Sequence, residues 1–597
     1  MLLWKHLSHI GPFICALWLA LPACASDGYR HHQGNEDDVA ESLDERLTAE
    51  QPVQWRREDL PANSDQQSWV HFKILGINDF HGQLGVGRRV ANRPVGSAPV
   101  LAAYLRAEMA NAENSSILVH AGDHVGATPP NSALLQDEPS IHFLNLLANK
   151  HCGYNKRMNP RCNIVGTPGN HEFDEGKHEM LRLIFGGNHV DGPFLEDPYR
   201  GTNFPYISAN VEEVASGKPI LPPYVIKKIR GQRVAFIGAV LKETPTIVTP
   251  AGVVGVQFID EADAINRYVS KLKHKGVRAI IVLIHQGTRQ TSYEGPTQDG
   301  LPPLAGSIGD IVHRLDDEVD IVVSGHAHSF TNTLMANRNG KKILVTQAFS
   351  SSTAYADIDV ALDPKTKDIV EKSAAIITTW ADDPNFVPAA DVAQLVAAAD
   401  MRVAPLVNRV IGSAAQAITR VENAGGESAL GNLIADAQRT VMNSDFAFMN
   451  PGGIRADIDA GEVLWGELFT VQPFNNDLVR MNLTGAQIKA LLEQQWQGQI
   501  GRILKVSGLG YTWNAAAPLG SRIVEIHKAD GVPLDMNATF SVTVNSFIAG
   551  GGDSFTVLTQ GTNRTVGPVD LDALVTYLGG LTQPFSAEIE GRILRQN

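Results

Sequence analysis

Short apolar runs in the first half of the chain repeatedly end in side chains of the kinds that bind metals. Five such runs occur in order, at residues 72–77, 117–120, 163–166, 279–284 and 321–323. Amphipathic stretches with helical spacing alternate with them, for example at residues 100–109 and 141–148. This alternation is typical of layered α/β folds. Because open α/β sheets bind ligands at the edge where strand ends converge, we expect the polar side chains to meet there.

The side chains at these strand ends are carboxylates, imidazoles and one amide. They are Asp79, His81, Asp123, Asn170, His285, His326 and His328. Asp79 and His81 are two residues apart, which predicts that both face the same side of an extended segment. The mixture of nitrogen and oxygen ligands suits Zn, Mn, Fe or Co better than Ca or Mg, whose sites are all oxygen. The thiolates of a structural zinc site are absent from this set.

The number of candidate ligands points to a paired metal site. Seven ligands are too many for one tetrahedral ion, but they suit two ions that share a bridging carboxylate. Such sites clamp the attacking and leaving oxygens of a displacement and lower the pKa of water towards ~7. Each motif alone is weak, because a Gly-Asn-His sequence is often a plain turn and 19 histidines allow chance pairs. The presence of ligand-type residues at the ends of five successive strands favours the metal site.

The length of the chain predicts more than one domain. A chain of 597 residues exceeds what one hydrophobic core usually supports. The composition predicts a first domain at residues 70–363, a linker at 364–411 and a second domain at 412–597. A stretch rich in Ala, Val and Leu at residues 389–410 predicts a helix that connects the two lobes and acts as a hinge region.

The first 25 residues are typical of an export signal. Lys5 provides a positive start, residues 10–21 are apolar but too short to span a bilayer, and small residues precede a cleavage point after Ala25. This signal predicts a periplasmic or secreted protein. A buried N-terminal helix and a lipoprotein anchored through Cys24 are the alternatives. Residues 26–69 are acidic and poor in apolar side chains, which predicts a disordered spacer.

Cysteine usage indicates the redox environment of the protein, and its net charge limits the kinds of partner that it can bind. Cys152 and Cys162 are the cysteines that remain after the signal, and an even pair in an oxidising compartment predicts a disulfide. The alternative, a metal site, lacks the spacing for four ligands. The net charge of −14 argues against binding a nucleic-acid polymer but not against nucleotides, because a bound metal inverts the local field. No later apolar run is long enough to cross a membrane.

Motifs in both halves of the chain carry a family resemblance. Those that resemble the calcineurin-like metallophosphoesterase signature are Asp-Phe-His at 79–81, Gly-Asp at 122–123, Gly-Asn-His-Glu at 169–172 and Gly-His-Ala-His at 325–328. Phe173 and Asp174, which follow the Gly-Asn-His-Glu motif, narrow the resemblance to the 5'-nucleotidase family. This family includes periplasmic UDP-sugar hydrolases and ecto-5'-nucleotidases. Motifs that resemble the nucleotide-binding domain of that family lie at residues 431–437, 450–455, 473–476 and 545–553.

The resemblance implies a fold and an activity. The fold is α/β (α+β), with a four-layer metallophosphoesterase β-sandwich flanked by helices, a linker helix and a second α/β nucleotide-binding domain. The activity is that of an exported two-metal phosphohydrolase, which converts nucleoside 5'-monophosphates to nucleoside and phosphate by attack of a metal-bound hydroxide. UDP-sugars are further candidate substrates, and the protein would be a monomer or a dimer.

The resemblance also implies a role for each residue of the metal site. One ion is held by Asp79, His81, Asp123 and His328, and the other by Asp123, Asn170, His285 and His326. Asp123 bridges the two ions, which would be Zn, Mn or Co. His171 is implied to stabilise the phosphoryl transition state with Asp174 as its partner, since a carboxylate favours the cationic imidazole and a cation stabilises developing charge. Glu172 is expected to serve the turn itself.

In the second domain the resemblance implies a nucleotide site. Phe474 and Phe547 would sandwich the base, although composition alone favours ordinary core positions for both rings. Arg455 would meet the phosphate or the nucleoside, while Asn450 and Asp553 would hydrogen-bond base or ribose. The glycines at 550–552 allow the backbone to approach a ligand closely.

Two departures from the family pattern leave the substrate open. Some relatives carry arginines that grip phosphate just before the helix that begins near residue 428, whereas residues 423–428 here contain none and the nearest is Arg420. His328 replaces an amide found in some relatives. A 2',3'-cyclic-nucleotide 2'-phosphodiesterase with 3'-nucleotidase activity is an alternative on the same scaffold, and the thiohydrolase of sulfur oxidation is a more distant one. A non-catalytic surface-binding protein would predict losses among the ligand residues, and the sequence has none.

Overall fold

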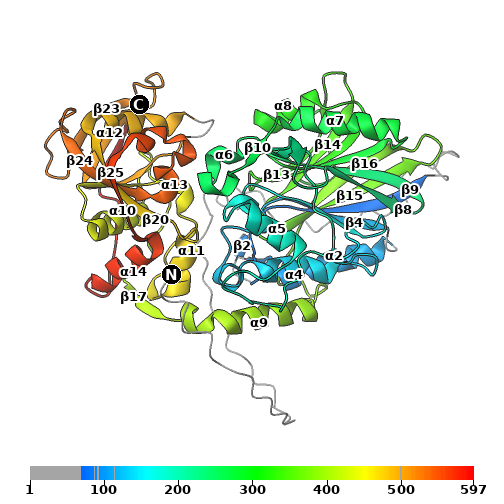
Figure 1. The fold of residues 1–597 in the computed structure, drawn as a ribbon, viewed down its shortest axis with the longest axis horizontal. Helices are drawn as coiled ribbons and strands as arrows, with labels where there is room; N and C mark the ends of the chain where they lie inside the picture. The colour runs from blue at the N-terminus through cyan, green and yellow to red at the C-terminus, as the bar shows by residue number, and fades with distance from the viewer. Residues whose placement is uncertain (1–68, 86–87, 91–92, 113–114, 498–500) are drawn as a thin grey trace, which may run out of the picture.

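The computed structural model describes residues 69–85, 88–90, 93–112, 115–497 and 501–597. The predicted export signal, Cys24 and residues 26–68 of the predicted spacer lie outside this part of the chain. Two lobes are visible, the first in blue to green and the second in yellow to red, with helix α9 (Ala390–Val407) beneath both (Figure 1).

The first lobe is built on two sheets. One sheet has the strand order β16-β15-β1-β4-β5 and the other has the order β13-β14-β12-β11-β9-β8. The strands of the first sheet are β16 (Asp368–Thr378), β15 (Ala354–Asp363), β1 (Val70–Ile77), β4 (Ser116–Ala121) and β5 (Ile164–Thr167). Those of the second are β13 (Phe330–Ala336), β14 (Lys342–Ala348), β12 (Val319–Ser324), β11 (Ala279–His285), β9 (Gln232–Val240) and β8 (Tyr224–Ile229). Strands β1, β4 and β5 run parallel to one another, and so do β9, β11, β12 and β14.

Alternating side chains of the strands join these sheets into layers. On β4, Ile117 and Val119 pack between the two sheets, whereas Leu118 packs under helices α2 (Ala98–Asn111) and α4 (Glu138–Leu147). Helices α7 (Glu261–His274) and α8 (Gly306–Arg314) cover the outer face of the second sheet. The lobe therefore has four layers, helix–sheet–sheet–helix, as the resemblance predicted.

The linker differs in detail from the prediction. Strand β16 pairs with β15 at the edge of the first sheet, so this sheet continues through residue 378, past the domain end expected at residue 363. Composition misses this because only Ile369 and Ala374 of β16 are buried, and its first half also contains Asp368, Glu371, Lys372 and Ser373. Helix α9 packs against α2, α3 (Pro130–Ala133) and α4 of the first lobe and against α11 (Trp465–Val471) of the second.

The second lobe has its own sheet and core. Its main sheet has the order β21-β18-β24-β20-β25, formed by β21 (Lys505–Ser507), β18 (Phe446–Met449), β24 (Thr539–Asn545), β20 (Asp477–Thr484) and β25 (Thr562–Val569). Its main helices are α10 (Ala429–Met442), α12 (Gly485–Glu493) and α14 (Asp570–Gly580). Helix α10 begins where it does because the Ser428 side chain accepts a hydrogen bond from the Gly431 N–H.

Smaller elements complete the two lobes. The remaining strands are β2 (Arg88–Val90), β3 (Arg93–Val95), β6 (Val211–Glu213), β7 (Lys218–Pro219), β10 (Val256–Phe258), β17 (Val410–Ala414), β19 (Gly461–Leu464), β22 (Leu509–Asn514), β23 (Ile523–Lys528) and β26 (Ile593–Gln596). The remaining α-helices are α5 (Lys177–Phe185), α6 (Thr244–Ile247) and α13 (Ser546–Ala549). Within the described ranges, every helix is too short or too polar to cross a membrane.

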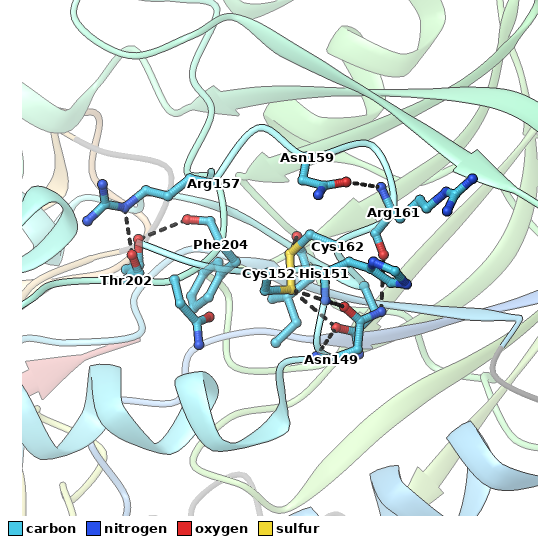
Figure 2. The surroundings of a disulfide bond; sticks show 12 residues. Asn149, His151, Cys152, Arg157, Asn159, Arg161, Cys162, Thr202 and Phe204 are labelled. Carbon is cyan, nitrogen blue, oxygen red and sulfur yellow. Dashed lines mark hydrogen bonds between the residues drawn. A yellow bond between two sulfur atoms is a disulfide. The ribbon is translucent and has the colours of Figure 1, made fainter. Parts of the chain in front are cut away.

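A disulfide joins Cys152 to Cys162 in the segment between α4 and β5, as predicted from the cysteine count. The closed segment is held in place by side-chain hydrogen bonds to backbone carbonyls: Arg157 Nε donates to Thr202 O at 2.6 Å, and Asn149 Nδ2 donates to Arg161 O at 3.1 Å (Figure 2). Cys162 lies at the amino end of β5, so the disulfide is at the opposite end of this strand from Asn170.

Replacing both cysteines by serine is expected to lower the free energy of unfolding by about 2–3 kcal/mol, because a short loop is no longer closed in the unfolded chain. Thermal unfolding should show this loss. As a control, a reductant should lower the melting temperature of the wild type and leave the double variant unaffected. Equal stability of the two oxidised proteins would contradict the prediction.

Candidate metal centre and nucleotide site

The candidate ligands lie where the carboxyl ends of the two sheets meet. Asp79 and His81 follow β1, Asp123 follows β4 and Asn170 follows β5, all in the first sheet. His285 is the last residue of β11, and His326 and His328 follow β12, both in the second sheet. The ligand types therefore converge from two sheets, whereas a single sheet edge was expected.

The backbone at these positions is unusual. Five of the seven residues have a left-handed conformation, with φ of 49° at Asp79, 47° at His81, 48° at Asp123, 76° at His326 and 43° at His328. Residues other than glycine adopt such angles rarely, at a cost of order 1–3 kcal/mol each, and they cluster at functional sites. The expectation that Asp79 and His81 share one side of an extended segment is wrong, because β1 ends at Ile77 and a turn follows.

Even so, the turns bring the predicted sets together. Asp79, His81 and His328 form one group whose ligand atoms lie within 4.8 Å of one another, and Asp123, His285 and His326 form another. His81, Asp123 and His171 form a third group that overlaps both. Asp123 thus lies between the two predicted ligand sets, where a bridging carboxylate belongs.

The imidazole of His81 is oriented to offer a lone pair. Its Nδ1 donates to the Gly126 carbonyl at 2.8 Å, which leaves Nε2 unprotonated in the neutral ring. Burial and the neighbouring His328 lower the pKa of His81 to about 3, so the ring is neutral at physiological pH. This Nε2 lies 3.0 Å from His328 Nε2 and 3.8 Å from Asp123 Oδ2.

His285 is arranged in the same way on the second sheet. Its Nδ1 donates to the Ala121 carbonyl at 2.7 Å, and its Nε2 lies 3.0 Å from Asp123 Oδ2. Burial lowers the pKa of His285, but the carboxylates of Asp123 and Asp79 outweigh burial and raise it to about 9. The environment of this Nε2 therefore favours a positive charge, which a proton or a metal ion can provide.

The residues present fit a divalent metal pair. Asp79 and Asp123 are both buried, and imidazoles are their ion-pair partners. The Asn170 Oδ1 atom is also buried and has no hydrogen-bond partner among the described residues. A buried carbonyl oxygen without a donor costs free energy unless something else binds it. Cations placed beside Asp123 would satisfy this oxygen and compensate both carboxylates.

Glu172 and Asn78 hold the ligand loops, a role that the motifs did not reveal. The Glu172 carboxylate accepts backbone N–H groups of Asp123 at 3.1 Å, His124 at 2.8 Å and Gly169, which ties the loop after β4 to the loop after β5. Asn78 Nδ2 donates to Asp79 Oδ2 at 2.6 Å. Glu172 does more than form its own turn, because its contacts with Asp123 and His124 join distant parts of the chain and leave no local pattern in the sequence.

His171 and Asp174 form the expected pair beside the metal ligands. His171 Nδ1 lies 2.6 Å from Asp174 Oδ2, and the His171 backbone N–H donates to Asp123 Oδ1 at 2.9 Å. Burial lowers the pKa of His171, while Asp174 and Asp123 raise it to about 9. The imidazole is therefore cationic at neutral pH.

The second lobe reaches this pair through Phe474. Its ring stacks on the His171 ring, with centroids 5.9 Å apart and planes 15° apart. The Arg455 guanidinium lies 5.9 Å from the centroid of Phe474. Phe474 and Phe547 are each only partly buried, unlike ordinary core rings.

The other predicted nucleotide residues gather in loops of the second lobe. Asn450 Nδ2 donates to Asp553 Oδ2 at 3.0 Å. The Phe547 ring lies against Gly552, where an added Cβ would come within 2.5 Å of the ring, so no larger residue fits there. A Cβ added at Gly550 would lie 3.2 Å from Pro250 Cγ of the first lobe, so the loop that carries Asp553 lies next to that lobe.

A four-layer lobe with Asp, His and Asn side chains gathered at its strand ends is typical of metal-dependent phosphoesterases. Comparison with known proteins agrees. Residues 72–330 match the family described as calcineurin-like phosphoesterase, and residues 410–560 match the family described as 5'-nucleotidase, C-terminal domain.

Individual relatives are similar over most of the chain. The chain is 35% identical over 536 residues to endonuclease YhcR of Bacillus subtilis (strain 168), covering 88% of this chain and 41% of that protein. It is 34% identical over 550 residues to cell wall protein Lmo0130 of Listeria monocytogenes, covering 85% of this chain and 67% of that protein. The crystal structure of a 5'-nucleotidase precursor from Thermus thermophilus is similar with a TM-score of 0.70 and 28% identity, covering 88% of this chain and all of that one.

The chain belongs to the 5'-nucleotidase family of metal-dependent phosphoesterases, which confirms the resemblance inferred from the motifs. It spans about two fifths of the length of the Bacillus relative and two thirds of that of the Listeria relative.

Glu172→Gln tests the role of this side chain in holding the ligand loops. The amide nitrogen would face backbone N–H donors, so at least one buried donor loses its acceptor, at a cost of about 1–3 kcal/mol. We expect a lower melting temperature for the metal-free protein. We also expect a metal affinity about 10–100-fold weaker in a calorimetric titration. Glu175→Gln, at an exposed position three residues away, is the matched control. An unchanged metal affinity in Glu172→Gln would contradict the role.

Proposed function

We propose that the protein is an exported two-metal phosphohydrolase that converts nucleoside 5'-monophosphates to nucleoside and phosphate. One observation carries the proposal: Asp123 joins two groups of metal-ligand side chains, and Phe474 of the second lobe stacks on His171 beside them. Metal ligands, a cationic imidazole and an aromatic ring in one place suit a phosphate ester that carries a base.

The proposed ligands divide as the resemblance implies. One ion belongs to Asp79, His81, Asp123 and His328, and the other to Asp123, Asn170, His285 and His326, with Zn, Mn or Co as candidate metals. When bound, the ions would supply Lewis-acid stabilisation of phosphoryl oxygens and would make water more acidic. The support is the unpartnered Asn170 Oδ1 and the two buried carboxylates.

His171 is proposed as the cation that stabilises charge on the transferring phosphoryl group. Its short contact with Asp174 keeps the ring oriented, and its backbone N–H holds Asp123. A positive group placed before reaction stabilises the transition state without reorganisation at the moment of reaction. Asp174 then acts as the orienting partner.

The second lobe is proposed to bind the nucleoside. Phe474 and Phe547 would contact the two faces of the base, Arg455 the phosphate or nucleoside, and Asn450 and Asp553 the base or ribose. The support is the partial exposure of both rings and the placement of Phe474 and Arg455 beside His171. UDP-sugars remain further candidate substrates.

Export is proposed from the N-terminal signal, with the Cys152–Cys162 disulfide as support because disulfides persist in oxidising compartments. The Listeria relative is named a cell wall protein, which agrees with a location outside the cytoplasm.

Asp123→Ala tests the metal site. Loss of a carboxylate shared by both ions should reduce the rate of phosphate release from AMP by more than roughly 100-fold. Loss of a residue that only hydrogen-bonds to a metal ligand typically costs up to about that factor. Metal analysis of the purified variant should show that the binding of both ions is weaker than in the wild type. Asp359→Ala, an exposed carboxylate on β15, is the control. Near wild-type activity of Asp123→Ala would refute the site assignment.

Phosphodiesters are the second candidate substrate. The Bacillus relative is named an endonuclease, and 2',3'-cyclic nucleotides are the alternative substrate from the sequence. A panel of AMP, UMP, UDP-glucose, 2',3'-cyclic AMP and single-stranded DNA, run with Zn, Mn and Co, separates the candidates. We expect 5'-monophosphates to give the highest kcat/KM, with no cleavage of the polymer. Faster hydrolysis of the cyclic nucleotide would favour the alternative.

The pKa of His171 predicts a pH dependence. If the cationic ring is required, activity is lost as pH rises through the pKa, which Asp174 and Asp123 raise to about 9. Asp174→Asn removes one of these charges and keeps an acceptor, so the alkaline limb of kcat/KM should move to lower pH. The folding energy that this pair contributes is likewise present below about pH 6.5 and lost as pH rises through the folded pKa. An unmoved alkaline limb would mean that another group sets it.

A further inference from the structure

Arg502 is a charged side chain that none of the sequence motifs contains. It lies shortly before β21, and its backbone N–H donates to Gln495 O at 2.8 Å. Its Nε lies 3.3 Å from Asp553 Oδ1. The Arg502 side chain is 36% exposed, whereas that of Asp553 is 10% exposed. A partly exposed guanidinium therefore meets a nearly buried carboxylate in the loop that is proposed to contact the nucleoside.

The Asp553 carboxylate is held from both sides. Its Oδ2 accepts from Asn450 Nδ2 at 3.0 Å, and Asn450 Oδ1 accepts from Asn545 Nδ2 at 2.9 Å. Asp553 itself has a left-handed backbone with φ of 55°. The chain of contacts from Asn545 to Arg502 joins four segments of the second lobe, and such an arrangement fixes the orientation of a carboxylate within narrow limits.

The same contacts oppose the effect of burial on the Asp553 carboxyl group. Burial raises the pKa of this carboxyl group, and Arg502 and Asn450 act in the opposite direction. An ionised carboxylate has about four acceptor positions, of which the contacts to Arg502 and Asn450 use two. The remaining acceptor positions can receive hydroxyl or amide donors of a ligand.

Arg502 precedes a residue that packs against the loop of residues 423–428, where Lys505 Nζ already donates to Gly426 O at 2.7 Å. The next residue, Ile503, packs on Gly426, where an added Cβ would lie 2.6 Å from Ile503 Cγ2. Gly426 belongs to the loop of residues 423–428, which contains no Lys or Arg. A guanidinium has five N–H donors, and its partial exposure leaves some of them accessible to an anionic or polar ligand.

We propose that Arg502 is a positioning residue that determines specificity for nucleotides by fixing the Asp553 carboxylate for contact with the nucleoside. The proposal rests on the proposed function of the second lobe. Because Arg502 acts on the nucleoside side, it affects binding of nucleotides and leaves phosphoryl transfer itself unchanged.

Two substrates separate these effects: AMP, which has a nucleoside, and p-nitrophenyl phosphate, which has none. In Arg502→Ala, the KM for AMP should rise roughly tenfold, because a hydrogen bond to a charged group is lost. The kcat for AMP and the kcat/KM for p-nitrophenyl phosphate should stay within about twofold of the wild type. In Arg502→Lys, the KM for AMP should lie between those of Arg502→Ala and the wild type. Arg595→Ala removes an exposed arginine that lies over Trp513 in the same lobe and should change neither substrate.

A double-mutant cycle tests whether Arg502 acts through Asp553. With Asp553→Asn already present, Arg502→Ala should raise the KM for AMP much less than it does in the wild type. Full additivity would overturn the proposed coupling. Equal losses with both substrates together with a lower melting temperature would assign Arg502 a structural role instead. A wild type that cleaves p-nitrophenyl phosphate but no nucleotide would refute the proposed function as a whole, whereas an unchanged KM for AMP in Arg502→Ala would refute only this inference.

Discussion

The contacts of the Asp123 carboxylate are the constraint on which the first lobe depends. This buried group lies after β4 in one sheet, yet its Oδ2 is 3.0 Å from His285 Nε2 at the end of β11 in the other. Its Oδ1 accepts the backbone N–H of His171. An isolated carboxylate in such a place would be strongly destabilising. The two sheets must therefore meet in a fixed register for the charge to be compensated, and the left-handed turns at the ligand positions are the local cost of that register.

The same constraint explains why supporting residues are polar and buried. Glu172 joins the loops after β4 and β5 through three backbone N–H groups, and Asn78 bonds to the Asp79 carboxylate. The ligand loops of the first sheet are thus fixed by side chains that belong to neither ligand group. Because these loops are already ordered, metal binding would not have to order the chain. This preorganisation favours both a high metal affinity and a defined arrangement of the ligands.

The layered α/β fold and the candidate ligands could be predicted because they leave local signals, and the family resemblance added the four-layer arrangement. Apolar runs such as residues 279–284 end in a ligand type within one residue, and family motifs surround Asn170 and His326. The left-handed turn at His81 could not be predicted, because residue spacing indicates which side a side chain faces only where the backbone is extended. The strand β16 is half exposed and looks like linker, and the roles of Glu172 and Arg502 depend on partners that are distant in sequence. Phe474 was expected to face a base, but the sequence gives no hint that its ring would also stack on His171.

The proton affinity of His171 is partly a property of the second lobe, whose Phe474 stacks on its ring. Burial lowers the pKa of His171, Asp174 and Asp123 raise it to about 9, and Arg455, which lies beside Phe474, opposes that rise by repulsion of like charges. By thermodynamic reciprocity, binding a proton at His171 must disfavour the arrangement that holds Arg455 nearby, to the same extent that Arg455 disfavours the proton. Protonation of the His171 imidazole and the placement of Arg455 near it are therefore linked, and an anionic group between these two side chains would relieve their repulsion.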